Sequence, residues 1–208
     1  MTCSAYINEI SGKVDFREET DIDEYPYSLK PGIITYRLDN LSPDIKESKD
    51  QLRAVTVAFR VWQLRIKDLK FKREYDPNKE VDIRISFEPL ETFSSPGVLA
   101  HATLPHPHVD LYCEINDEWN WVSHSKIADI GHPPLVPILI HEFGHILGLR
   151  HDTHDKASIM YPSFNLGQKK NQLGPRDIER IQERYGKRNI SQRFIDYFRR
   201  RRDMGWDF

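Results

Sequence analysis

The sequence has few cysteines and no long apolar run, and these absences exclude several classes of protein. Its two cysteines, Cys3 and Cys113, could pair, but they are too few for a disulfide framework, and we expect reduced thiols. The apolar run from Leu135 to Ile140 is far too short to cross a bilayer. The N-terminus lacks a basic start followed by an apolar stretch, so we expect no secretory signal. The protein would then be a mature or cytoplasmic form, or be exported by a non-classical route.

A strong excess of one charge is also missing. The formal net charge is −2, which gives no general attraction to nucleic acid. The 208 residues, 38% apolar and 30% charged, are typical of a globular protein with one core of ordinary size. The charge is uneven, because Asp15 to Glu24 is acidic and the C-terminal end is basic. We therefore divide the chain into an acidic N-terminal arm (1–30), one domain (31–186) and a basic C-terminal tail (187–208).

Hydrophobic periodicity predicts a mixture of strands and helices in this domain. Apolar residues three and four positions apart predict a helix that begins at Ser42-Pro43-Asp44 and reaches Ile66. Two further helices are predicted, one from Gly131 through Leu147 and one from Gly174 to Gly186. Residues 1–30 show weak periodicity and are predicted to be irregular, and Ser191 to Arg202 has the composition of a C-terminal helix. Short alternating or β-rich segments predict strands at 33–38, 69–72, 81–87, 97–102 and 109–112.

One segment combines three histidines, a glutamate and a glycine at fixed spacing, as H-E-x-x-H-x-x-G-x-x-H. His141 and His145 are four residues apart on a predicted helix, so both imidazoles leave the same face and can bind one ion. Gly148 can adopt the left-handed conformation that ends a helix, which lets His151 approach from another direction. Three neutral imidazoles leave a fourth position for water, as a catalytic zinc site requires.

Two neighbouring residues extend this pattern. Glu142 follows the first histidine, where it can take a proton from zinc-bound water and pass it to a leaving amine. Met160 lies downstream in a predicted tight turn, Ser158 to Pro162. The alternative is a set of solvated histidines near a helix end and a methionine in ordinary core packing. The glycine where the chain must turn favours a metal site instead.

Together, these residues resemble the matrixins, the matrix-metalloproteinase branch of the metzincin zinc endopeptidases. The similarity covers residues 31–186, and Met160 looks like the methionine of the Met-turn, which forms an apolar floor below the metal. The resemblance implies an α+β, zincin-like fold: a twisted mixed sheet of about five strands with an antiparallel edge strand, and three main helices. It also implies a monomeric zinc-dependent endopeptidase with one catalytic Zn²⁺, in which zinc-bound water attacks the peptide bond with help from Glu142. Other matching segments are 31–37, 58–62, 82–87, 97–105 and 177–186.

The resemblance further implies where a protein or peptide substrate would bind. An extended peptide would lie antiparallel to the edge strand through backbone hydrogen bonds. The residues of that strand are Val98, Leu99 and Ala100. Specificity would come from an S1′ pocket beside the active-site helix. The wall of this pocket would include Pro162, Ser163 and Phe164, the last standing where the family usually has tyrosine.

The chain also departs from the matrixin pattern. Asp152 follows the third histidine where matrixins usually have serine, as in the adamalysin branch, and the stretch from there to the methionine is one residue longer than usual. His101 matches a ligand of the family's structural zinc, but Tyr112 stands where another ligand is expected. We therefore expect no second zinc unless His106 or His108 substitutes, and a solvated loop is the alternative.

A structural calcium is an additional candidate cofactor. Asp110, Glu114 and Asp117 offer the hard oxygen ligands that calcium prefers, and a solvated acidic loop is the preferred alternative. The family's usual cysteine-containing pro-segment is not expected, because the neighbours of Cys3 do not match it. Some bacterial relatives block the zinc with an aspartate, so we hypothesise that a carboxylate within Asp15 to Glu24 does so here.

Three functions compete at this point. The first is an active zinc endopeptidase, the second a binding module that has lost turnover, and the third a zinc hydrolase of a non-peptide or cell-wall amide. The presence of Glu142 argues against the second. The basic, aromatic tail could dock on a partner, an anionic membrane or nucleic acid, but packing on the catalytic domain is the preferred interpretation.

Overall fold

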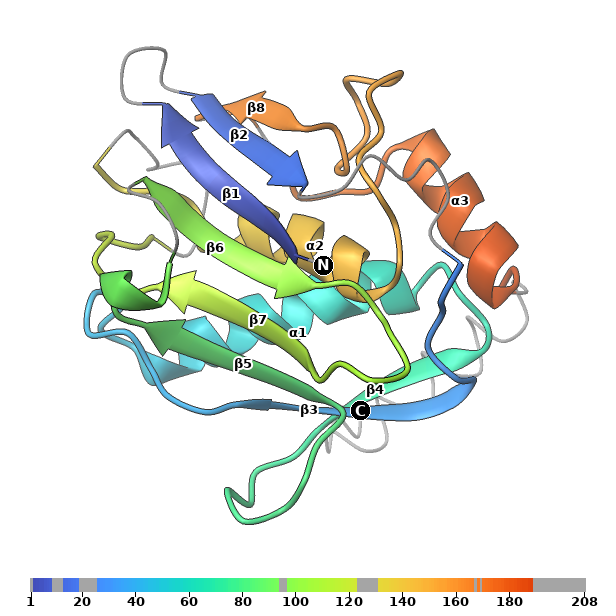
Figure 1. Cartoon of the computed structure of the whole chain (residues 1–208), viewed down its shortest axis with the longest axis horizontal. Coiled ribbons are helices and arrows are strands. Elements are labelled where there is room, and N and C mark those ends of the chain that lie inside the picture. Colours follow the sequence, from blue (N-terminus) through green and yellow to red (C-terminus); the bar gives the residue numbers. More distant parts are fainter. Residues whose placement is uncertain are drawn as a thin grey trace, which may run out of the picture.

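The computed structural model describes residues 2–8, 13–18, 26–93, 97–122, 131–166, 168 and 170–188. Within these residues, one mixed eight-stranded sheet is accompanied by three α-helices and a short 3-10 turn at Leu90–Thr92 (Figure 1). The predicted α+β class is confirmed, although the sheet has more strands than the five or so expected. Helices α1 and α2 lie against one face of the sheet, and α3 lies to its side (Figure 1). None of the described helices is both long and apolar enough for a membrane span.

The sheet has the order β4-β3-β5-β7-β6-β1-β2-β8. Strand β3 pairs in parallel with β4 and β5, and β5 pairs in parallel with β7, whereas the other neighbours are antiparallel. The five predicted strands correspond to β3 through β7. The strands are β1 Thr2–Asn8, β2 Lys13–Glu18, β3 Gly32–Leu38, β4 Leu69–Arg73, β5 Ile83–Glu88, β6 Val98–Thr103, β7 Leu111–Asn116 and β8 Ser163–Asn165.

Residues 2–8 and 13–18 of the N-terminal arm form the two paired strands of a β-hairpin, so the prediction of irregular structure is wrong there, whereas residues 26–30 have no helix or strand, as predicted. Strand β1 pairs with both β2 and β6, and β2 pairs with β8, all antiparallel. Val14 and Phe16 are buried while Lys13 and Asp15 are more exposed, which is the period-two pattern of a strand with one buried face. The many charged residues of this segment hide the alternation of apolar and polar residues when only its composition is considered. As a result, β6 lies inside the sheet and is not the edge strand that the resemblance predicted.

The helices are α1 Ser48–Gln63, α2 Leu135–Ile146 and α3 Pro175–Tyr185. The first begins six residues after the predicted start at Ser42. The reason is Gln51, whose side chain accepts a hydrogen bond from the Ser42 N–H and donates to the carbonyls of Ser42 and Ile45. These bonds satisfy the backbone of the preceding segment in a non-helical conformation, so the helix starts later.

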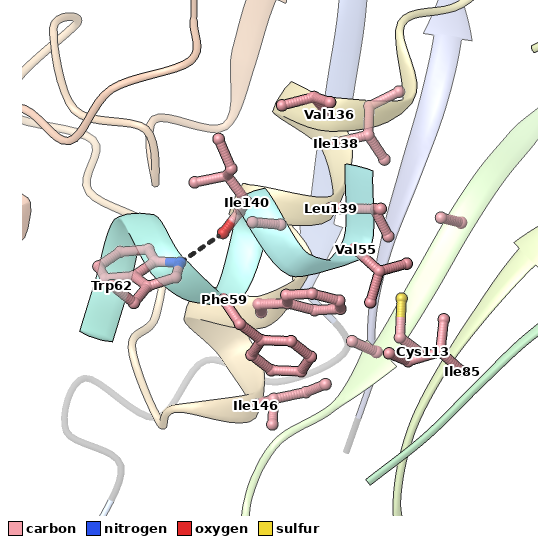
Figure 2. Close-up of a cluster of buried hydrophobic side chains, with 14 of the residues drawn as sticks. Val55, Phe59, Trp62, Ile85, Cys113, Val136, Ile138, Leu139, Ile140 and Ile146 are labelled. Atoms are coloured by element: carbon pink, nitrogen blue, oxygen red, sulfur yellow. Dashed lines mark hydrogen bonds between the residues drawn. The ribbon is translucent and has the colours of Figure 1, made fainter. Parts of the chain in front are cut away.

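Helix α2 is the central element, and all twelve of its residues are buried. The Phe59 ring of α1 stacks on Phe143 of α2 with centroids 3.9 Å apart. The indole N–H of Trp62 donates to the carbonyl of Ile140 at 2.9 Å (Figure 2). Burying each such aromatic side chain stabilises the fold by roughly 1.5–3 kcal/mol. The packing therefore fixes the position of α2, which carries the first two motif histidines.

Candidate metal centre and active site

The structure brings the three motif histidines together at the end of α2. The Nε2 atoms of His141 and His145 lie 3.0 Å apart, because residues four positions apart share a helix face. The chain then turns at Gly148, whose φ of 82° is in the left-handed region. A Cβ at that glycine would come within 2.9 Å of the Tyr27 carbonyl oxygen. After the turn, the Nε2 of His151 lies 3.1 Å from that of His141.

Backbone carbonyls hold two of these imidazoles in one tautomer. The Nδ1 of His141 donates to the carbonyl of Ile159 at 2.8 Å, and the Nδ1 of His145 donates to the carbonyl of Leu149 at 2.8 Å. With Nδ1 protonated, the lone pair of the neutral ring is on Nε2. Such bonds from the distal nitrogen are the usual support of a histidine that binds a metal.

The electrostatics also favour neutral rings. Burial, followed by repulsion from the neighbouring imidazoles, holds the pKa of His141 well below its usual range. Burial and the neighbouring His151 lower the pKa of His145 in the same way. Neutral imidazole is the form that binds zinc, so both groups are ready for a metal near neutral pH.

These residues fit a zinc ion. Tetrahedral coordination with Zn–N distances of about 2.0–2.1 Å would place the nitrogens roughly 3.3 Å apart. The distances of 3.0 and 3.1 Å from His141 Nε2 to the other two Nε2 atoms are close to this value. They also form the single group of three or more potential ligands found in the described parts of the chain. Three nitrogen ligands are the number expected of a catalytic rather than a structural zinc site.

Glu142 lies next to the first histidine and is fully buried. Neither of its carboxylate oxygens has a hydrogen-bond partner among the described residues. Burial raises the pKa of this carboxyl well above its usual range. An unpaired buried carboxyl destabilises a fold, so its presence beside the histidines is typical of a functional site.

The predicted methionine turn packs beneath α2. Met160 is fully buried, and a Cβ added at Gly144 would clash with its Sδ. Only a glycine on α2 therefore allows this close approach. Asp152 lies beside the turn, where its N–H donates to the Met160 carbonyl and its carboxylate accepts from Arg176 at 2.7 Å. In this structure, the aspartate that departs from the matrixin pattern links the third-histidine segment to α3.

Asp177 is a supporting residue that the sequence analysis missed. It is fully buried on α3 and accepts hydrogen bonds from the Ser158 hydroxyl and from the Ile159 N–H, the latter at 2.7 Å. The carbonyl of Ile159 is the group that holds the His141 ring. The sequence offered one indication of a role for Asp177, its position in the first turn of a helix. There its carboxylate also accepts a hydrogen bond from the Gly174 N–H. That position indicates the start of a helix, but it does not predict hydrogen bonds to residues far away in the sequence.

Both predicted substrate-binding segments contact the N-terminal hairpin. On β6, Val98, Leu99 and Ala100 are buried, and the register pairs Ala100 with Ala5 of β1. On the other side, the Pro162 carbonyl accepts a hydrogen bond from the Phe16 N–H at 2.7 Å. Strand β2 also pairs with β8, which contains Ser163 and Phe164.

The second region of interest for metals has a different arrangement. His101 Nε2 lies 2.6 Å from a carboxylate oxygen of Glu114, its cross-strand partner, and its ring meets Tyr112 edge-on. The rings of His106 and His108 lie near each other, with centroids 5.8 Å apart. In the described residues, neither these histidines nor the three acidic residues considered for calcium, Asp110, Glu114 and Asp117, form a group of three ligands. Residues 189–208 of the basic tail and residues 19–24 of the acidic stretch lie outside the described residues.

The comparisons with known proteins agree with this geometry. A profile of the Matrixin family matches residues 28–186. Matrix metalloproteinase-18 of Xenopus laevis is 36% identical over 163 residues, which are 74% of this chain and 32% of the relative. Interstitial collagenase of Bos taurus is 33% identical over 177 residues, 79% of this chain and 35% of the relative. Macrophage metalloelastase of Rattus norvegicus is 31% identical, covering 74% and 32%. The chain thus spans about a third of the length of these relatives.

The mixed sheet, the buried helix with two motif histidines and the methionine turn below it define a fold of the metzincin class. Within that class, the chain belongs to the matrixin family.

Proposed function

We propose that this protein is a zinc-dependent endopeptidase that hydrolyses peptide bonds of extended protein or peptide substrates. The observation that carries the proposal is the convergence of three imidazoles beside a buried carboxyl that lacks a partner in the described residues. The Nε2 atom of His141 lies 3.0 Å from that of His145 and 3.1 Å from that of His151, and the potential ligand atoms of all three lie within 4.8 Å of one another. Family membership supports the same activity, since the three relatives are named as a matrix metalloproteinase, an interstitial collagenase and a metalloelastase.

In this proposal, His141, His145 and His151 hold the zinc ion. When bound, zinc supplies Lewis acidity, which polarises a carbonyl and acidifies water. Glu142 accepts the proton of the attacking water and then donates it to the leaving amine, which completes hydrolysis without a covalent enzyme intermediate. Its raised pKa suits a group that must both take and release a proton near neutral pH.

The chain's other residues have supporting roles in this proposal. Met160 forms the apolar floor under the metal, since it packs against α2 at Gly144. Val98, Leu99 and Ala100 would bind the substrate backbone along β6 when β1, which pairs with β6 in this structure, is displaced. The wall of the S1′ pocket would be formed by Pro162, Ser163 and Phe164. Phe164 lacks the hydroxyl of the tyrosine usual at this position, which makes the wall more apolar.

The test is cleavage of a mixed peptide library by the full chain, read by mass spectrometry. Glu142→Ala should keep about one zinc per chain but lose roughly 10²–10⁴-fold in kcat/KM, the usual contribution of a general acid–base group. A zinc chelator should abolish cleavage by the parent protein, and added zinc should restore it.

The alternatives give different results in this assay. A binding module would bind peptides without cleaving them, and a hydrolase of another amide would leave the library intact but act on non-peptide amides. Glu142→Ala with undiminished cleavage would contradict the assigned role of that residue.

A further inference from the structure

The N-terminal hairpin lies between the two segments that are proposed to bind substrate. Strand β1 pairs with β6 over Thr2 to Tyr6, and β2 pairs with β8 over Lys13 to Asp15 (Figure 1). Strand β1 is antiparallel to β6, which is also the direction expected of a peptide substrate. The backbone groups of β6 that a substrate would use are therefore already paired with this chain's own residues.

The hairpin also covers the metal-binding histidines directly. The ring of Phe16 stacks on that of His141, with centroids 3.5 Å apart and an interplanar angle of 12°. The same ring lies 6.2 Å from the ring of His151 and 6.0 Å from that of Phe164. Phe16 is 5% exposed, so the contact excludes solvent from this side of the centre.

This contact is apolar and contributes no ligand. Successive side chains of a strand point to opposite faces, so Asp15 points away from the face on which Phe16 meets His141. Asp15 instead lies opposite Ser163 in the register and is partly exposed. The hypothesis of a blocking carboxylate is therefore not supported at Asp15, and the side chain of Glu18 and residues 19–24 lie outside the described part of the chain.

We propose that the hairpin β1–β2 is an inhibitory segment of this chain, with β1 in the place of the substrate and Phe16 as an apolar plug over the metal centre. The proposal rests on the proposed function, because it concerns access to the same site. A substrate strand and β1 need the same hydrogen-bonding edge of β6, so they cannot be bound together. Activation then requires the hairpin to leave β6 and β8.

A reversible cross-link tests this in the full chain. Lys13 and Asn165 are opposite each other on β2 and β8, and both are exposed. Opposite residues of antiparallel strands have Cα atoms about 4.5–5.5 Å apart, within the span of a disulfide. We would therefore prepare Lys13→Cys/Asn165→Cys with Cys3→Ser, since the one other cysteine, Cys113, is buried. Mass spectrometry would establish that the disulfide forms.

The first readout does not depend on turnover. It is the rate at which dipicolinate removes zinc from the loaded protein. We expect the oxidised, locked form to lose zinc at least tenfold more slowly than the same protein after reduction, and to cleave peptides at least tenfold more slowly. Equal rates for the two forms would overturn the proposal. Lys13→Cys with Cys3→Ser alone, treated with the same oxidant, controls for oxidation.

A second variant acts in the opposite direction. Phe16→Ala removes the plug and should speed both zinc removal and peptide cleavage severalfold. Phe93→Ala is its matched control, because Phe93 is also a buried ring against a histidine, His101, but away from the metal centre. An unchanged zinc-removal rate in Phe16→Ala would count against the plug.

The two proposals can fail separately. If the disulfide slows zinc release but no variant cleaves peptides, the inhibitory hairpin is supported and the peptidase function is contradicted. Peptide cleavage that depends on Glu142 but is the same in locked and reduced protein supports the peptidase and contradicts the inhibitory hairpin.

Discussion

The two histidine regions of this protein use the same side chain in opposite ways. At the end of α2, the imidazoles of His141 and His145 donate through Nδ1 to backbone carbonyls, and their Nε2 atoms lie 3.0 Å apart. On β6, His101 instead uses Nε2 to meet the carboxylate of Glu114. A ring nitrogen that is already paired with a carboxylate is not available to a metal unless that pair is broken.

Burial differs between the two regions as well. His141 and His145 are fully buried, whereas the side chains of His101 and Glu114 are 14% and 25% exposed. In a partly exposed histidine–carboxylate pair, the two side chains hydrogen-bond to each other, and water can satisfy their remaining hydrogen-bonding groups. The buried cluster has three nitrogens facing one point, and such an arrangement is stabilised by a cation. The number of histidines in a region is therefore a poor indicator of metal binding. The hydrogen-bond partner of each imidazole nitrogen is a better one.

The largest expected effect comes from removing one nitrogen of the cluster. His141→Ala should reduce bound zinc from about one equivalent to a small fraction after dialysis, because two imidazoles hold zinc far less tightly than three. His101→Ala should retain the full equivalent. Elemental analysis of both proteins, with circular dichroism to establish that each is folded, measures the difference. Zinc loss from His101→Ala would remove the contrast between the two regions.

A smaller effect is expected from the support behind the cluster. Asp177→Asn replaces one acceptor oxygen by an amide group, so the turn that presents the Ile159 carbonyl to His141 loses part of its anchoring. Loss of such an outer partner typically weakens metal binding by about 10–100-fold. Competition with a chromophoric chelator would measure the affinity.

The matched control is Glu179→Gln on the same helix, since Glu179 is exposed and the change in charge is the same. We expect it to leave zinc affinity unchanged. If both variants weakened zinc equally, the effect would come from charge on α3 and not from the hydrogen bonds to the turn.

The sequence was informative where the determinants are local. The spacing of His141 and His145 follows from the helix period, and the turn at Gly148 follows from the conformational freedom of glycine, so the cluster could be predicted. Five strands and two of the three helix starts were also read from local periodicity and end signals.

The features that were missed depend on residues far apart in the chain. The pairing of Ala5 with Ala100 and the stacking of Phe16 on His141 join segments that carry no sequence signal for each other. The same holds for the bond from Ile159 to Asp177. Register and partner choice in a sheet are set by packing of the whole fold, which periodicity within one strand does not contain.

The smallest predicted effect concerns the pair in the second region. A double-mutant cycle of His101→Ala and Glu114→Gln should give a coupling of about 1 kcal/mol in the free energy of unfolding, because a partly exposed hydrogen-bonded pair is screened by water. Urea unfolding of the four proteins measures it. All four should bind the same amount of zinc, since the pair stabilises β6 against β7 by direct contact. A coupling near zero, together with zinc content that falls when either partner is replaced, would instead make this pair part of a second metal site.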